Sequence, residues 1–234
     1  MECAHIPVSN IAECVKRLYG NAPGRRLPIS GSIEVPARCN LRCAHCYINL
    51  SACDHEAKSR ELTTQEFYKI IDQSADEGCL WLLLTGGEPF IRPDFPDIYT
   101  YAVKKGLLTT LFTNGTCITP EIADRIAELP PLSIEITLYG STKETYESVT
   151  GIPGSYERCL RGIGLLLERK LPLELKSMVL TLNKKEVWDM KAYAENLGLK
   201  FRFDPVLNLR LDRRVGPEGV RIPSREVVDM DILD

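Results

Sequence analysis

The stretch "CNLRCAHCY", residues 39–47, places three thiols at a spacing that suits metal binding. Three residues separate Cys39 from Cys43, two separate Cys43 from Cys46, and His45 lies between the last two cysteines. The chain has nine cysteines, and chance rarely brings three of them so close together. In a reducing compartment such a cluster indicates metal binding or catalysis rather than a disulfide framework. The first candidate for chemistry is therefore this short segment.

Two kinds of metal site fit the spacing. A closed zinc site takes four ligands, generally as two close pairs, and the fourth would come from His45, Cys53 or His55. An iron–sulfur cube is also held by thiolates, and three protein ligands leave one of its irons with an open position. An open iron can chelate a substrate or a cofactor, which a structural clip does not need to do. The cysteines alone leave both kinds of site open.

The elements that must position these thiols follow from the hydrophobic pattern. Short apolar runs predict strands over 32–36, 80–85, 107–112, 132–138, 173–180 and 199–204. Amphipathic stretches predict helices over 63–77, 94–105, 120–129, 155–169 and 185–197. Thr63 followed by Glu66 forms a capping box at the start of the first helix. Strict alternation predicts a parallel α/β sheet with right-handed crossovers, lying open or curled into a full or partial barrel.

Polar segments follow the first three predicted strands. The cysteine loop comes after the first strand, Gly86-Gly87-Glu88-Pro89 after the second, and Thr113-Asn114-Gly115 after the third. In parallel α/β proteins the chemistry gathers at the carboxyl ends of the strands. We therefore expect these three segments to meet at one site.

Together these segments resemble the radical S-adenosylmethionine (SAM) superfamily. The resemblance is carried by Cys-x3-Cys-x2-Cys with a following aromatic residue, and by Gly-Gly-Glu-Pro after the second strand. The stretches "CNLRCAHCY", "LLTGGEPFIRPDF", "TNGT" and "GIPGSYERCLRGI" are most similar to the SPASM/twitch branch. The resemblance covers roughly residues 30–204 and implies a (β/α)6 partial TIM barrel.

The resemblance also implies a cofactor and its ligands. Cys39, Cys43 and Cys46 would hold three irons of a [4Fe–4S] cluster, and the fourth iron would bind the amino and carboxylate groups of SAM. The resemblance implies that Tyr47 lies near the adenine of SAM. The backbone of Gly86 and Gly87, with Glu88, would receive the methionine ammonium. Asn114 and Thr137 would contact the ribose or the methionyl carboxylate, and Lys176 is a weaker candidate. In many relatives the fourth strand ends in an aspartate where Tyr139 stands here, so that aspartate's role is not carried over.

The implied activity is that of an oxidoreductase or maturase. One-electron reduction of SAM by a flavodoxin- or ferredoxin-type donor gives methionine and a 5′-deoxyadenosyl radical, which abstracts hydrogen from a substrate. The substrate expected first is a peptide or protein. The alternatives are a small molecule in tetrapyrrole or cofactor biosynthesis, and activation of a glycyl-radical enzyme. A zinc-stabilised α/β binding module without catalysis is the alternative from another class.

Composition and the order of segments predict the partners, the localisation and the domain bounds. A net charge of −3 without a basic stripe argues against nucleic acid as a partner. The start of the sequence lacks the apolar core of a signal peptide, and the longest apolar stretch, 79–84, is too short for a membrane span, so a cytoplasmic protein is expected. We expect a helical extension over 1–29, the radical SAM core over 30–205, and a tail over 206–234 that resembles the beginning of a SPASM/twitch region. No cysteine follows Cys159, so thiol ligands for an auxiliary cluster are not expected in this sequence.

Overall fold

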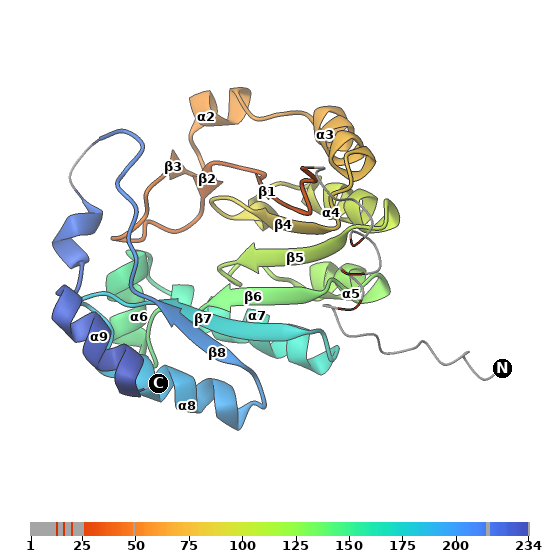
Figure 1. Cartoon of the computed structure of the whole chain (residues 1–234). Helices are drawn as coiled ribbons and strands as arrows, with labels where there is room; N and C mark the ends of the chain where they lie inside the picture. The colour runs from red at the N-terminus through yellow and green to blue at the C-terminus, as the bar shows by residue number, and fades with distance from the viewer. Residues whose placement is uncertain are drawn as a thin grey trace.

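The computed structural model describes residues 13, 16, 20, 26–48, 50–213 and 216–233. Its centre is a six-stranded sheet in which every neighbouring pair is parallel, in the order β1-β4-β5-β6-β7-β8 (Figure 1). The strands are β1 (Ser30–Glu34), β4 (Trp81–Thr85), β5 (Leu108–Thr113), β6 (Ser133–Thr137), β7 (Leu173–Met178) and β8 (Phe201–Asp204). This confirms the predicted α/β partial barrel.

Helices alternate with these strands and form the outer layer (Figure 1). They are α3 (Thr64–Asp76), α4 (Phe95–Lys104), α5 (Pro120–Glu128), α6 (Lys143–Thr150), α7 (Ser155–Glu168) and α8 (Val187–Asn196), with the 3-10 turns η1 (Pro89–Ile91) and η2 (Lys184–Glu186). Figure 1 shows the sheet curved around an open side that no helix covers in this view. None of the helices in the described ranges is long and apolar enough to cross a membrane.

The core lies between the sheet and the outer helices. In β4 and β6 buried residues alternate with half-buried ones, so that Leu82, Leu84, Ile134 and Ile136 face the helices. The other set of side chains points to the concave face and stays half-buried. The concave face of this barrel is therefore available to contact a ligand, whereas the convex face is occupied by packing.

Predicted and observed elements agree closely for the long segments. All six predicted strands and all five predicted helices form, and their ends move by at most two residues, apart from the first turn of the last helix, which is the separate 3-10 turn η2. The capping box of Thr63 and Glu66 is present at the start of α3. The helical extension expected over 1–29 lies almost entirely outside the described residues.

Several short elements were not predicted. They are β2 (Arg38–Cys39), β3 (Leu50–Ser51), α2 (His55–Ser59), α6, η3 (Pro217–Val220) and α9 (Ser224–Leu233). The helix α6 has a short, largely polar sequence, KETYESVT, in which Tyr146, Val149 and Thr150 form the buried face. Its sequence signals are its caps: the Thr142 side chain accepts a hydrogen bond from the Thr145 N–H, and Gly151 adopts φ 65° at the end.

Two glycines in α7 give a matched test of the helix–sheet packing. A Cβ at Gly162 would lie 2.1 Å from the carbonyl oxygen of Gly115, whereas a Cβ at Gly164 would meet no atom within 4 Å. We expect Gly162→Ala to destabilise the protein by about 2–3 kcal/mol, because backbone must move to admit the methyl group. Gly164→Ala is expected to stabilise it by about 0.5–1 kcal/mol through helix propensity. Urea unfolding of both variants measures the difference, and equal stabilities would contradict the close approach of α7 to the turn after β5.

Candidate functional site

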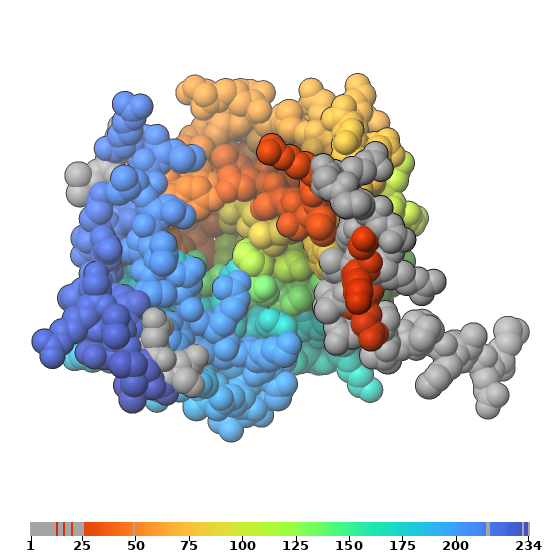
Figure 2. All heavy atoms as spheres, in the orientation of Figure 1, coloured from red at the N-terminus to blue at the C-terminus, as the bar shows by residue number. Residues whose placement is uncertain are grey.

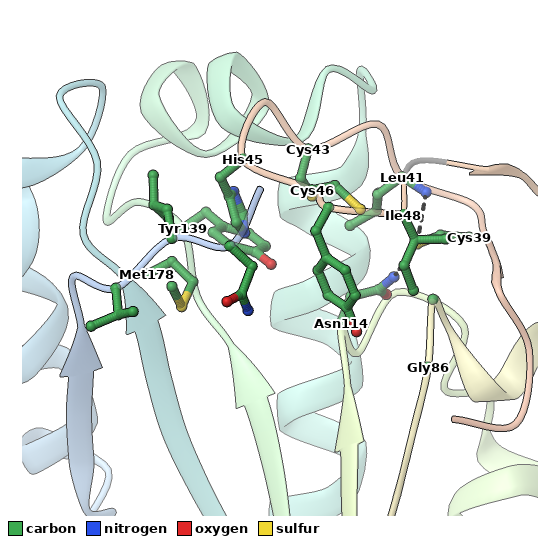
Figure 3. A pocket seen from close by; sticks show the side chains of 15 residues that line it. Cys39, Leu41, Cys43, His45, Cys46, Ile48, Gly86, Asn114, Tyr139 and Met178 are labelled. Carbon is green, nitrogen blue, oxygen red and sulfur yellow. Dashed lines mark hydrogen bonds between the residues drawn. The ribbon is translucent and has the colours of Figure 1, made fainter. Parts of the chain in front are cut away.

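The carboxyl ends of the strands bring the three predicted segments together around one pocket of about 230 Å³ (Figure 3). The predicted site residues that line it are Cys39, Cys43, Cys46, Tyr47, Gly86, Gly87 and Asn114. The other lining residues are Leu41, His45, Ile48, Tyr139, Met178, Val206, Leu207 and Asn208. Segments that lie up to 170 residues apart in sequence therefore form a single site.

The three cysteines face this pocket as thiols outside any disulfide. The Cys39 sulfur accepts a hydrogen bond from the Leu41 N–H at 3.4 Å and lies 3.7 Å from the Asn114 side-chain nitrogen. Burial raises the pKa of Cys39 to about 12 and raises the pKa of Cys43 further. A metal must therefore displace protons from these thiols when it binds.

The arrangement of the thiols bears on the choice of metal. Among the described residues, no three His, Cys, Asp or Glu side chains converge as ligands of one metal ion. A zinc site requires such convergence, because each thiolate lies about 2.3 Å from the ion. A [4Fe–4S] cube carries its thiolates on separate irons and accepts a wider spacing. Zinc bound by these thiols would therefore require the loop to bring them closer together.

The cysteine loop is held in place by the end of α6. The Arg42 N–H donates to the Thr150 carbonyl oxygen, and the Ala44 N–H donates to the Val149 carbonyl oxygen, each at 2.9 Å. The left-handed Gly151 closes the helix directly beneath the Arg42 carbonyl. The unpredicted helix α6 is thus a support of the candidate metal site.

The base of the same loop is joined to the Gly-Gly turn. The Gly87 N–H donates to the Pro36 oxygen at 2.7 Å, and the Glu88 N–H donates to the Arg38 oxygen at 3.0 Å. A Cβ at Gly87 would lie 2.1 Å from the Arg38 oxygen, and Gly86 adopts φ 140°, which favours glycine. Glycine is required here because two backbone segments touch.

A buried ion network fixes the outer side of this junction. Arg38 and Arg92 both pair with Glu61, at 2.7 and 3.5 Å, and Arg92 also pairs with Asp94 at 2.6 Å. The side chains of Arg38, Glu61 and Arg92 are each at most 10% exposed. Removing one partner would leave a buried charge unpaired, so this network favours one position of the loop base.

The side chain of Glu88 does not face the pocket. Its carboxylate accepts hydrogen bonds from the Thr113 hydroxyl, the Asn114 N–H and the Phe90 N–H at 2.7–3.1 Å, and it is fully buried. Burial raises the pKa of Glu88 to about 7, against these three hydrogen bonds, which lower it. As it lies, this carboxylate accepts from donors of the protein, and its contact with a methionine ammonium stays a prediction. Glu88 ties the Gly-Gly turn to the end of β5.

The remaining predicted residues lie around a smaller, adjoining hollow of about 140 Å³. Thr137 and Lys176 line this hollow, and it shares Gly86, Gly87 and Asn114 with the larger pocket. The Asn114 side chain donates to the Asn40 side-chain oxygen at 2.9 Å and accepts from the Thr116 N–H at 2.9 Å, which fixes its orientation. Asn114 therefore stands between the two hollows.

Several pocket residues were not among the predicted contacts to the cofactor. His45, named above only as a possible zinc ligand, lines the pocket with its ring centroid 5.1 Å from that of Tyr139, and its buried Nδ1 has no hydrogen-bond partner among the described residues. Burial lowers the pKa of His45 to about 4. Tyr139, at the position of the missing aspartate, and Met178 complete the wall opposite Cys39 (Figure 3). The periodicity of Tyr139 and Met178 in sequence is that of ordinary strand and loop residues, so no pattern marked these two.

These residues fit the cofactors that the resemblance implies. Three thiols face one cavity, and the glycine turn lies at its edge. The donor set is that of an iron–sulfur cluster with an open coordination position. The hollows beside it offer polar groups to a ligand on that position.

Fold and site together define a parallel α/β partial barrel with a thiol-bound cofactor site at its strand ends. Residues 33–194 match the Radical SAM superfamily, and the chain belongs to this family. Members of the superfamily use a [4Fe–4S] cluster and SAM.

Similar proteins have several different names. The chain is 36% identical to the AdoMet-dependent heme synthase of Methanosarcina barkeri over 70% of this chain and 46% of that protein. It is 32% identical to the PqqA peptide cyclase of Ruegeria pomeroyi over 68% of this chain and 42% of that protein. The structure of Streptococcus suis SuiB bound to its precursor peptide SuiA has the same fold, with a TM-score of 0.66 at 14% identity, covering 87% of this chain and 46% of that one. The chain thus spans less than half the length of these relatives.

Proposed function

We propose that this chain is the catalytic core of a radical SAM enzyme that abstracts hydrogen from its substrate. The observation that carries the proposal is the convergence of Cys39, Cys43 and Cys46 with the Gly-Gly turn on one pocket. Bound there, the cluster and SAM would supply reductive cleavage of SAM to methionine and a 5′-deoxyadenosyl radical. A flavodoxin- or ferredoxin-type protein is the proposed electron donor.

The chain's own residues would bind and orient these groups. The three cysteines would ligate three irons, and the backbone of Gly86 and Gly87 would receive the methionine ammonium. Tyr47 would lie beside the adenine, with its hydroxyl held by Glu34. Asn114, Thr137 and Lys176 would contact the ribose or the carboxylate of SAM from the adjoining hollow. Glu88 would act indirectly, because its carboxylate holds the Gly-Gly turn and the backbone of Asn114 in place.

A peptide or protein is the first proposed substrate. The named peptide cyclase and the peptide-bound SuiB structure support it. A tetrapyrrole is the second, supported by the 36% identity to a heme synthase. Figure 2 shows that the concave face is hollowed, and we propose that the substrate enters there.

Anaerobic purification tests the proposal directly. We expect about four irons and four sulfides per chain after reconstitution, and 5′-deoxyadenosine after addition of SAM and dithionite. The reduced protein should show the electron paramagnetic resonance signal of a [4Fe–4S] cluster, altered when SAM is added. Stoichiometric zinc without iron, or a cluster that does not cleave SAM, would refute the proposal in favour of a binding module.

A further inference from the structure

We propose that Lys176 and Arg202, held on the concave face of the sheet by Glu135 and Phe112, bind a carboxylate group of the substrate. This inference rests on the proposed function, because it names a chemical group of the substrate that the same site takes. It assigns Lys176, the weaker candidate for SAM, to the substrate instead, beside the hollow that Lys176 and Phe112 line.

The register of three adjacent strands builds this subsite. Lys176 on β7 lies beside Thr137 on β6 and beside Arg202 on β8. Glu135, two residues before Thr137, pairs with both cations: its Oε2 atom lies 3.3 Å from the Lys176 Nζ and accepts a hydrogen bond from Arg202. Both cations also lie over the ring of Phe112 from β5. One carboxylate and one ring therefore hold two cations side by side.

These two cations keep hydrogen-bonding capacity for a ligand. An ammonium has three N–H donors and a guanidinium has five, and the one acceptor within reach of each among the described residues is Glu135. The Arg202 side chain is 50% exposed, and the concave face is hollowed between the first and last parts of the chain (Figure 2). A guanidinium with an open edge is the group best suited to a planar carboxylate, which it binds through two parallel hydrogen bonds.

The subsite also lies at the right place for the proposed reaction. Lys176 lines the hollow that shares Gly86, Gly87 and Asn114 with the cysteine pocket. A carboxylate held by Lys176 and Arg202 would therefore anchor a substrate one layer of side chains below the cofactor. Such an anchor fixes which carbon of the substrate faces the pocket, and orientation of this kind is a large part of catalysis.

The electrostatics of Lys176 support an added anion. Its side chain is only 14% exposed. Desolvation, together with the nearby Arg202, lowers the pKa of Lys176 to about 7, although the carboxylates of Glu135 and Asp204 raise it. A bound carboxylate would favour the protonated amine. We therefore expect the affinity for the carboxylate to be full below pH 7 and to fall as the pH rises through about 7–8, where Lys176 loses its proton. Lys176→Met should lower the affinity and remove this pH dependence.

Binding measurements on the full chain, loaded with cluster and SAM under anaerobic conditions, test the proposal. One probe is a glycine-rich peptide with a central Glu, blocked at both termini and labelled with a neutral fluorophore, with the Gln peptide as its neutral match. The other is a tetrapyrrole tetracarboxylic acid, followed by its Soret absorbance. The variant is Arg202→Gln, and its control is Arg125→Gln, which removes another half-exposed arginine paired with a carboxylate, on the outer helix layer.

We expect wild type to bind at least one of the two acids, and Arg202→Gln to weaken that binding about tenfold while Arg125→Gln leaves it unchanged. The acid that responds identifies the substrate as peptide or tetrapyrrole. The proposal is overturned if neither acid binds, if the Gln peptide is the responding probe, or if Arg202→Gln binds like wild type. SAM cleavage by wild type, measured on the same preparation, reports separately on the proposed function.

Discussion

Replacing Cys43 by serine is expected to lower SAM cleavage about a thousandfold or more, because the cluster loses a thiolate and the cofactor supplies the chemistry. Cys43 belongs to the buried core cluster, but serine is close to cysteine in size, so the barrel is expected to stay folded with a modest loss of stability. Iron and sulfide content, 5′-deoxyadenosine formation and far-UV circular dichroism together measure the outcome.

Cys79→Ser is the matched control for this experiment. Cys79 and Cys43 are both 8% exposed, but Cys79 lies away from the pocket, with its thiol against the Trp81 carbonyl oxygen at 3.3 Å. A serine hydroxyl can donate the same hydrogen bond, so cluster content and SAM cleavage should match wild type. If Cys43→Ser retained a full cluster, or if Cys79→Ser lost it, the assignment of the ligands would be wrong.

Replacing Gly87 by alanine has the second largest expected effect. The new Cβ would lie 2.1 Å from the Arg38 oxygen and 2.9 Å from the Ala37 oxygen, so backbone must shift on one side or the other. The shift separates the Gly-Gly turn from the base of the cysteine loop. We expect the affinity for SAM to fall about a hundredfold, because a displacement of about 1 Å is enough to lose a productive geometry.

The measurement is equilibrium binding of SAM to the reconstituted protein, with the iron content and melting temperature of each variant determined alongside. Gly164→Ala is the control, because its Cβ meets no atom within 4 Å, and it should bind SAM like wild type. Wild-type affinity in Gly87→Ala would show that contact between the two loops does not set the SAM site. A loss of iron without a loss of SAM binding would place the effect on the cluster alone.

Most of the fold could be predicted from the sequence because its signals are local. Continuous apolar runs such as 80–85 mark strands buried inside a sheet, and caps such as Thr63 mark the start of a helix. The helix α6 was missed because it is short and largely polar, although Thr142 and Gly151 cap its two ends. Its role in holding the cysteine loop depends on contacts that no local pattern encodes.

The candidate site could likewise be predicted only in part from the sequence. Motif spacing placed the cysteines, the Gly-Gly turn and Asn114 at one edge, and the structure brings them to one pocket. Tyr139 and Met178 carry no sequence signal, since their place on the pocket wall depends on how the loop and two strands meet. The direction of the Glu88 carboxylate, away from the pocket, likewise depends on donors from β5.

The sequence by itself determined the family, the parallel barrel, and the identity and spacing of the thiols, because these follow from residue types at fixed separations along the chain. Only the tertiary structure decided which side chains share a cavity. Lys176, Glu135 and Arg202 lie on three different strands, and the sheet register alone makes them neighbours. Contacts between strands depend on register and twist, which are set by packing of the whole sheet rather than by any one segment.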